Sequence, residues 1–241
     1  RGERVTKREA ELLPALRYLT RGYPIILAAL VVMLAATGAS TDFVFRTAAA
    51  HARTETEMAE LFGMLNAVVG VVVVGFQLSL TSRLLARVGV FNFVAIVPGL
   101  LIITSAASVL LPGSAFSWLV FMKGIEMAGA YSLNQTAVSL LYNPMPGDLR
   151  SQVRTLIDGA VKKSGAAAAG LVLGALAAFT PFLVGPWMVS LMAAAVLVLV
   201  PFLRTRYLDA LDDKLGQKKR ADRAAGVIDP SDRVTRNALR S

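Results

Sequence analysis

The sequence predicts an all-helical integral membrane protein with six transmembrane spans. The chain of 241 residues is 55% hydrophobic and only 17% charged, with a mean hydropathy of +0.59. Soluble domains are typically about 45–50% apolar and about one quarter charged. The apolar residues gather in runs of about 20, the length that a helix needs to cross roughly 30 Å of hydrocarbon. Basic residues lie mostly at the ends of these runs, so the apolar runs themselves are expected to lie in lipid.

The expected transmembrane domain covers residues 22–203. It lies between a basic segment at 1–21 and a basic tail at 204–241, and the tail is strongly polar and expected to be flexible. The expected spans are 23–45, 61–82, 90–111, 116–141, 155–179 and 182–203.

The distribution of lysine and arginine predicts the orientation. Of the 25 basic residues, 22 fall in the terminal segments, between spans two and three, and at the entry to span five. The opposite side holds Arg46 and Arg53, offset by Glu55, Glu57 and Glu60. Because positively charged loops stay in the cytoplasm, we expect a multi-pass protein of the cell (inner) membrane with both termini cytoplasmic.

Charged residues interrupt the fourth span. Lys123 and Glu126 are three residues apart and therefore share a helical face, and Asn134 falls near the same face. An ionisable residue at a helix centre costs about 2.5–3.5 kcal/mol on insertion scales, so it normally faces a cavity or a partner. The pair is either part of a substrate or proton site in a central cavity, or a self-satisfied ion pair that only specifies packing.

A second charged line enters span five. Arg150, Arg154, Asp158 and Lys162 recur at every fourth residue, and Lys163 follows. This spacing lets Asp158 pair with Arg154 on one side and with Lys162 on the other. The line is either a collar of cytoplasmic charges that reach to the membrane surface or the mouth of a cavity that attracts anions.

Smaller signals accompany these charges. The line in span five continues as Ala166, Gly170 and Gly174, which would let a neighbouring helix approach closely. Asp42 and Arg46 are spaced for an ion pair at the outer end of span one.

The composition excludes several kinds of chemistry. The chain has no cysteine and one histidine, His51, so no cysteine or histidine-rich metal site and no Ser/His/Asp arrangement is expected. Lys163-Ser164 resembles the end of a phosphate-binding loop but lacks the glycine before the lysine. We expect neither an enzyme nor a cofactor. The basic tail is expected to be solvated or to face lipid rather than to bind nucleic acid.

One segment carries a resemblance to a known family. Residues 130–146 read AYSLNQTAVSLLYNPMP, followed by a basic loop, LIDG at 156–159 and KKSG at 162–165. The segment resembles KYSLFDPTKEMAYIPLD and the sequence after it in the ATP:ADP antiporter family, the nucleotide translocases of plastids and intracellular bacteria. Residues 82–98 also look like the cytoplasmic turn between the second and third helices of a major-facilitator half. The matching positions are Tyr131, Ser132, Leu133, Tyr142, Pro144, Ile157 and Asp158.

The resemblance implies a fold and a place within it. The chain would be the C-terminal six-helix half of a twelve-span, major-facilitator-type transporter. The departures from the motif are Ala130 in place of its first lysine, and Val138 and Ser139 in place of its lysine–glutamate pair. In the family, the charges at these positions are linked to nucleotide recognition. Because this chain lacks them, it is expected to resemble the divergent bacterial relatives more than the nucleotide translocases themselves. A chain that begins at Arg1 without an initiator methionine is also expected to be a fragment.

Together these observations predict an alternating-access carrier of an anionic solute, for which a nucleotide is one candidate. Its expected partners are the bilayer and a second six-helix half, in the same polypeptide or in a second copy. Two alternatives remain: a non-transporting membrane anchor or regulatory module joined to soluble domains, and a major-facilitator permease for an unrelated substrate. The candidate substrate-binding residues are Lys123, Glu126, Asn134, Arg150, Arg154, Asp158, Lys162 and Lys163.

Overall fold

The computed structural model describes residues 18–19, 22–80, 87–179 and 185–224, which fold into helices without any strand. This confirms the prediction of an all-α fold, and several of the helices are long and apolar enough to cross a membrane. These helices number five within the described ranges: Tyr23–Ala52, Glu55–Leu78, Val90–Leu110, Leu149–Phe179 and Pro186–Gly216.

The expected span at 116–141 is not among these five helices. It forms three consecutive helical pieces: α6 (Ala115–Ala128), the π-helical η3 (Gly129–Asn134) and α7 (Gln135–Leu141). Its polar side chains, among them Lys123 and Glu126, lower its mean hydropathy below that of the other helices. The sixth crossing therefore stays a prediction.

The remaining elements follow the expected order. The first half contains α2 (Tyr23–Ala52), α3 (Glu55–Gly75), the π-helical η1 (Phe76–Leu80), α5 (Val90–Leu110) and the 3-10 turn η2 (Pro112–Ser114). The second half contains α8 (Gly147–Thr155), the π-helical η4 (Leu156–Val161), α9 (Lys162–Phe179) and α10 (Pro186–Ala224). Parts of two expected spans, at 81–82 and 182–184, lie outside the described residues.

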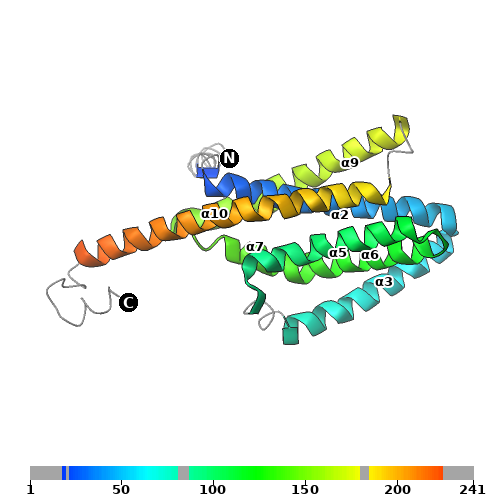
Figure 1. The fold of residues 1–241 in the computed structure, drawn as a ribbon, viewed down its shortest axis with the longest axis horizontal. Helices are drawn as coiled ribbons and strands as arrows, with labels where there is room; N and C mark the ends of the chain where they lie inside the picture. Colours follow the sequence, from blue (N-terminus) through cyan, green and yellow to red (C-terminus); the bar gives the residue numbers. More distant parts are fainter. Residues whose placement is uncertain (1–17, 20–21, 81–86, 180–184, 225–241) are drawn as a thin grey trace, which may run out of the picture.

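The structure corrects the prediction of a flexible tail from residue 204. Helix α10 continues without a break to Ala224, and its C-terminal part extends beyond the other helices (Figure 1). The extension packs on the bundle through Tyr207, whose ring contacts those of Tyr23 and Phe91. Further along, Lys214 Nζ donates to the carbonyl oxygens of Asn143 at 2.7 Å and Met145 at 3.2 Å. These contacts hold part of the polar segment as helix; residues 225–241 lie outside the described part.

The bundle has a packed centre and two open edges. Helix α10 packs on α5 and α2, while α6 packs on α5 and α2. Helices α3 and α9 diverge from the others at opposite edges of the view (Figure 1). Only 6% of the apolar window of each is buried, compared with 50% for α2. Both helices therefore leave most of their apolar surface uncovered by the described part of the chain.

Two glycines allow close contacts between helices. A Cβ at Gly129 would lie 2.5 Å from Val97 Cγ2, so glycine lets η3 approach α5. A Cβ at Gly165 would lie 2.9 Å from Val32 Cγ1, so α9 meets α2 there. Gly170 and Gly174 have no other group within 4 Å of a Cβ in the described chain. The helix approach expected along Gly170 and Gly174 is thus not made within the described chain, in which α9 diverges from the other helices (Figure 1).

Candidate functional site

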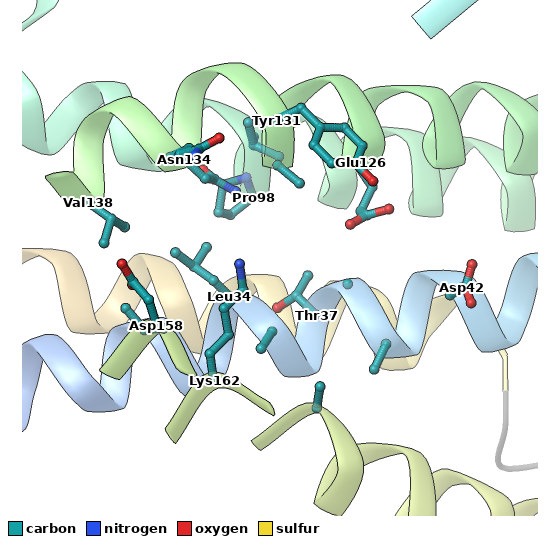
Figure 2. Close-up of a pocket in the computed structure, with 18 of the residues that line it drawn as sticks. Leu34, Thr37, Asp42, Pro98, Glu126, Tyr131, Asn134, Val138, Asp158 and Lys162 are labelled. Carbon is teal, nitrogen blue, oxygen red and sulfur yellow. The ribbon is translucent and has the colours of Figure 1, made fainter. Parts of the chain in front are cut away.

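A cavity of about 740 Å³ lies between α2, α5, the α6–α7 segment and the α8–α9 segment. This volume falls within the roughly 300–1,000 Å³ of typical small-molecule sites. Figure 2 shows side chains from these segments around one space, with Lys162 pointing from α9 toward α2 and the α6–α7 segment. Its polar lining consists of Thr37, Asp42, Lys123, Glu126, Tyr131, Asn134, Gln135, Ser139, Arg154, Asp158, Lys162 and Lys163.

The structure brings most of the predicted site residues to this cavity. All of them except Arg150 line it, although they come from two separate stretches of sequence. The guanidinium of Arg150 instead donates to the side-chain oxygen of Asn143, in the connection before α8. Arg150 therefore links α8 to the connection that precedes it and does not line the cavity.

The charges of the α6–α7 segment pair with each other and with α2. Lys123 Nζ lies 2.7 Å from Glu126 Oε2, so the two side chains form an ion pair. It also lies 3.0 Å from Asp42 Oδ1, a contact between helices that the spacing did not reveal. The expected pair of Asp42 with Arg46 forms as well, at 2.8 Å. The only sequence signal for a wider role of Asp42 is its position at the end of an apolar run.

A second cluster surrounds Asp158, where the chain passes from α8 to α9. Asp158 accepts from Tyr142 Oη at 3.0 Å and pairs with Arg154 Nε at 3.4 Å. The guanidinium of Arg154 also lies over the Tyr142 ring. Burial, and next the charge of Asp158, raise the pKa of Tyr142 above its usual value, so the phenol keeps its proton and donates.

The predicted pair between Asp158 and Lys162 does not form. Asp158 lies in the π-helical segment η4, and Lys162 begins α9. A π-helical turn contains more residues than an α-helical turn. A spacing of four residues across η4 therefore no longer places two side chains directly above each other, and Lys162 turns toward the cavity instead.

Lys162 and Lys163 supply positive charge that the cavity wall does not neutralise. No carboxylate of the described chain lies within ion-pair distance of either ammonium, although both line the cavity. Four cationic and three anionic side chains line the cavity, so its wall has a formal excess of one positive charge. An anion is the solute class that such a wall attracts.

Two π-helical segments contribute to the cavity wall. Tyr131 and Asn134 of η3 and Asp158 of η4 all line it. Asn134 Oδ1 is buried without a hydrogen-bond donor from the described chain. Single π-helical turns within α-helices occur frequently at functional sites, so both interruptions support this cavity as the candidate site.

Comparisons of the chain with protein-family models, with curated proteins and with solved structures found no match. The class is therefore given by the fold and the cavity alone. The described chain is an all-helical protein whose apolar helices are able to cross a membrane, with a cavity of mixed charge between them.

Proposed function

We propose that this chain is one six-helix half of a membrane transporter that carries an anionic solute by alternating access. The observation that carries the proposal is the charged cavity, because seven charged side chains line it between helices that are otherwise apolar. Lys123 and Glu126 lie within the fourth expected span, and an ionisable residue costs about 2.5–3.5 kcal/mol at the centre of a membrane helix. A wall of this kind suits a path for water and a charged solute, whereas packing alone requires far fewer charges.

The proposed topology has six spans with both termini in the cytoplasm. It rests on the basic residues, 22 of 25 of which fall on one side of that arrangement. The chain forms only one wall of a transport path. In the proposal, the second half covers the exposed apolar faces of α3 and α9, because only 6% of the apolar window of each is buried in the described chain. That half is either in the same polypeptide or a second copy.

The contacts of the cavity suggest different roles for its lysines. Lys162 and Lys163 have no carboxylate partner in the described chain and would contact the anion first. Lys123 was expected to be the anion contact, but two carboxylates hold it. An anion would therefore reach Lys123 only by displacing a carboxylate.

Nucleotides are the first solutes to test. The resemblance of residues 130–165 to the nucleotide translocases supports this choice. Tyr131 also lines the cavity with its side chain exposed, so it offers a ring on which a base would stack. Inorganic phosphate tests the alternative that the cavity selects charge alone.

The testing experiment is an uptake screen on the full-length protein in proteoliposomes. Vesicles preloaded with unlabelled ADP, ATP or phosphate receive the same compound in labelled form outside. The proposal expects accumulation of at least one of these anions above that in protein-free vesicles. If none of them accumulates, with correctly inserted protein, the proposal for these anions is wrong.

A second candidate is a non-transporting module that anchors or regulates a soluble partner. The observation that favours it is the length of α10, whose 39 residues span about 58 Å at roughly 1.5 Å per residue. That length exceeds the roughly 30 Å of hydrocarbon, so a rigid helix would project toward a partner. Under this candidate the screen finds no uptake, and the reading frame upstream encodes soluble sensor domains instead of another six-span half.

A further inference from the structure

Two carboxylates share one lysine at the wall of the cavity. The Lys123 ammonium lies 3.0 Å from Asp42 Oδ1 of α2 and 2.7 Å from Glu126 Oε2 of α6. The Lys123 and Glu126 side chains are only 10% and 16% exposed. We name these three residues the triad. By itself it contains one positive and two negative charges.

Neighbouring charges compensate Asp42 better than Glu126. Arg46 on α2 pairs with the second oxygen of Asp42. For Glu126, Lys123 is the only cation of the described chain within ion-pair distance. Lys162 of α9 acts on Glu126 from farther away, and Asp42 repels it. Helices α5 and α7 and the segment η3 contribute no charged residue at all.

The triad lies deep along its helix. Lys123 and Glu126 follow Ala115, the first residue of α6, by about 12 and 16 Å at roughly 1.5 Å per residue. In the proposed topology this is near the middle of roughly 30 Å of hydrocarbon. A carboxylate that loses its counter-charge at such a depth is neutralised by taking up a proton, because an isolated buried charge costs far more.

From this arrangement we propose that Glu126 is the proton-coupling site of the transporter, an inference that rests on the proposed function. When an anionic group of the solute takes the Lys123 ammonium, the Glu126 carboxylate accepts a proton from water and becomes a carboxylic acid. When the solute leaves on the other side of the membrane, Lys123 pairs with Glu126 again, and the proton is released on the side where the solute left. Solute and proton therefore cross together in the same direction.

Glu126 rather than Asp42 takes this proton. Asp42 keeps Arg46 as a partner after Lys123 is withdrawn, whereas no other cation is within ion-pair distance of Glu126. Gly38 of α2 also borders the site, since a Cβ there would lie 3.0 Å from Glu126 Oε1. This carboxylate thus lies against the backbone of α2.

Infrared difference spectroscopy tests the proton without requiring any transport. In the full-length protein in liposomes, Lys123→Met removes the counter-charge as a bound anion would. At neutral pH this variant should show the carbonyl band of a protonated carboxylic acid, which the wild type lacks. The band should disappear in Lys123→Met/Glu126→Gln and remain in the matched control Lys123→Met/Asp42→Asn.

Two infrared outcomes would overturn the proposal: no band in Lys123→Met, or a band that persists without Glu126. If Lys123→Met fails to fold, acid titration of the wild type replaces it as the test. The carboxylic acid band that appears first as the pH is lowered should be absent from Glu126→Gln.

A pH dye trapped in the vesicles tests the coupling of proton and solute. In vesicles that contain no anion at the start, net uptake of any anion found in the screen should acidify the interior, and this acidification should be lost in Glu126→Gln. An uptake screen without a hit counts against the proposed function only, whereas uptake without acidification refutes the coupling.

Discussion

Lys123 Nζ lies 3.0 Å from Asp42 Oδ1, and this contact ties α6 to α2 at the wall of the charged cavity. Glu126 completes the triad from the next turn of α6. The contact joins the first and fourth of the expected spans. It therefore links the stability of the bundle to the electrostatics of the candidate site.

Removing the lysine of the triad should destabilise the protein strongly. Lys123→Ala leaves two carboxylates side by side without their shared cation, and breaking a buried pair in this way costs about 3–5 kcal/mol. We expect a markedly lower melting temperature in detergent, and loss of any uptake although the protein still inserts. The triple variant Asp42→Asn/Lys123→Met/Glu126→Gln should recover most of the stability. A melting temperature of Lys123→Ala equal to that of the wild type would refute this role.

A methyl group at Gly129 should disturb the packing of η3 on α5. The added Cβ would lie 2.5 Å from Val97 Cγ2, and overpacking of this kind typically costs about 1–3 kcal/mol. Gly129→Ala should therefore melt earlier than the wild type, and Val97→Ala should partly rescue it. Gly170→Ala is the matched control, because no other group of the described chain lies within 4 Å of its Cβ. Equal losses in both glycine variants would contradict the packing described for η3.

The Tyr142 hydroxyl should stabilise the connection before α8. Tyr142→Phe removes the donor to the charged Asp158 Oδ1, which is expected to cost about 1.5–3 kcal/mol. Because the pKa of Tyr142 is raised in the folded protein, its contribution is fully present below about pH 10, where tyrosine in an unfolded chain ionises. It is then lost as the pH rises further.

Chemical denaturation of the wild type and of Tyr142→Phe at several pH values measures this contribution. The difference in unfolding free energy should be the same at pH 6 and pH 8 and should shrink above about pH 10. A difference that already changes between pH 6 and pH 8 would show that another group controls it.

Whether the expected fourth span, residues 116–141, crosses the membrane can be tested with single cysteines, because the chain contains no cysteine of its own. Ser114 precedes α6 and Ser151 lies in α8, and both are exposed. If the α6–α7 segment crosses the membrane, Ser114→Cys and Ser151→Cys should react with an impermeant thiol reagent from opposite sides of sealed vesicles. In the proposed orientation, Ser151→Cys faces the cytoplasm. Labelling of both from the same side would exclude six spans.

The sequence was sufficient to predict the helical class and most of the charged residues that line the cavity. Runs of about 20 apolar residues respond to the membrane and need no knowledge of tertiary contacts. Polar residues in such runs cost energy unless they face a cavity or a partner, which is why Lys123, Glu126 and Asn134 could be chosen as candidates. The structure indeed brings them to one cavity.

What the sequence could not predict depends on contacts between distant segments or on helix geometry. The pairing of Asp42 with Lys123 requires the packing of α2 on α6, which no local spacing encodes. The predicted pair of Asp158 with Lys162 was wrong because η4 is π-helical and changes the register. The C-terminal part of α10 was predicted as a flexible tail because the sequence after residue 203 is polar. The packing of Tyr207 on Tyr23 and Phe91 depends on distant segments and could not be predicted from that polarity.

The measurement that tests the central claim most directly is anion uptake after removal of the unpaired cations of the cavity. Lys162→Ala/Lys163→Ala removes two positive charges that line the cavity, and Arg204→Ala/Arg206→Ala removes two exposed ones on α10. Because a hydrogen bond to a charged group contributes about 1.5–3 kcal/mol, the first variant should lower uptake of ADP, ATP or phosphate about tenfold or more. The second should leave it unchanged. Equal uptake by both variants and the wild type would contradict an anion site in this cavity.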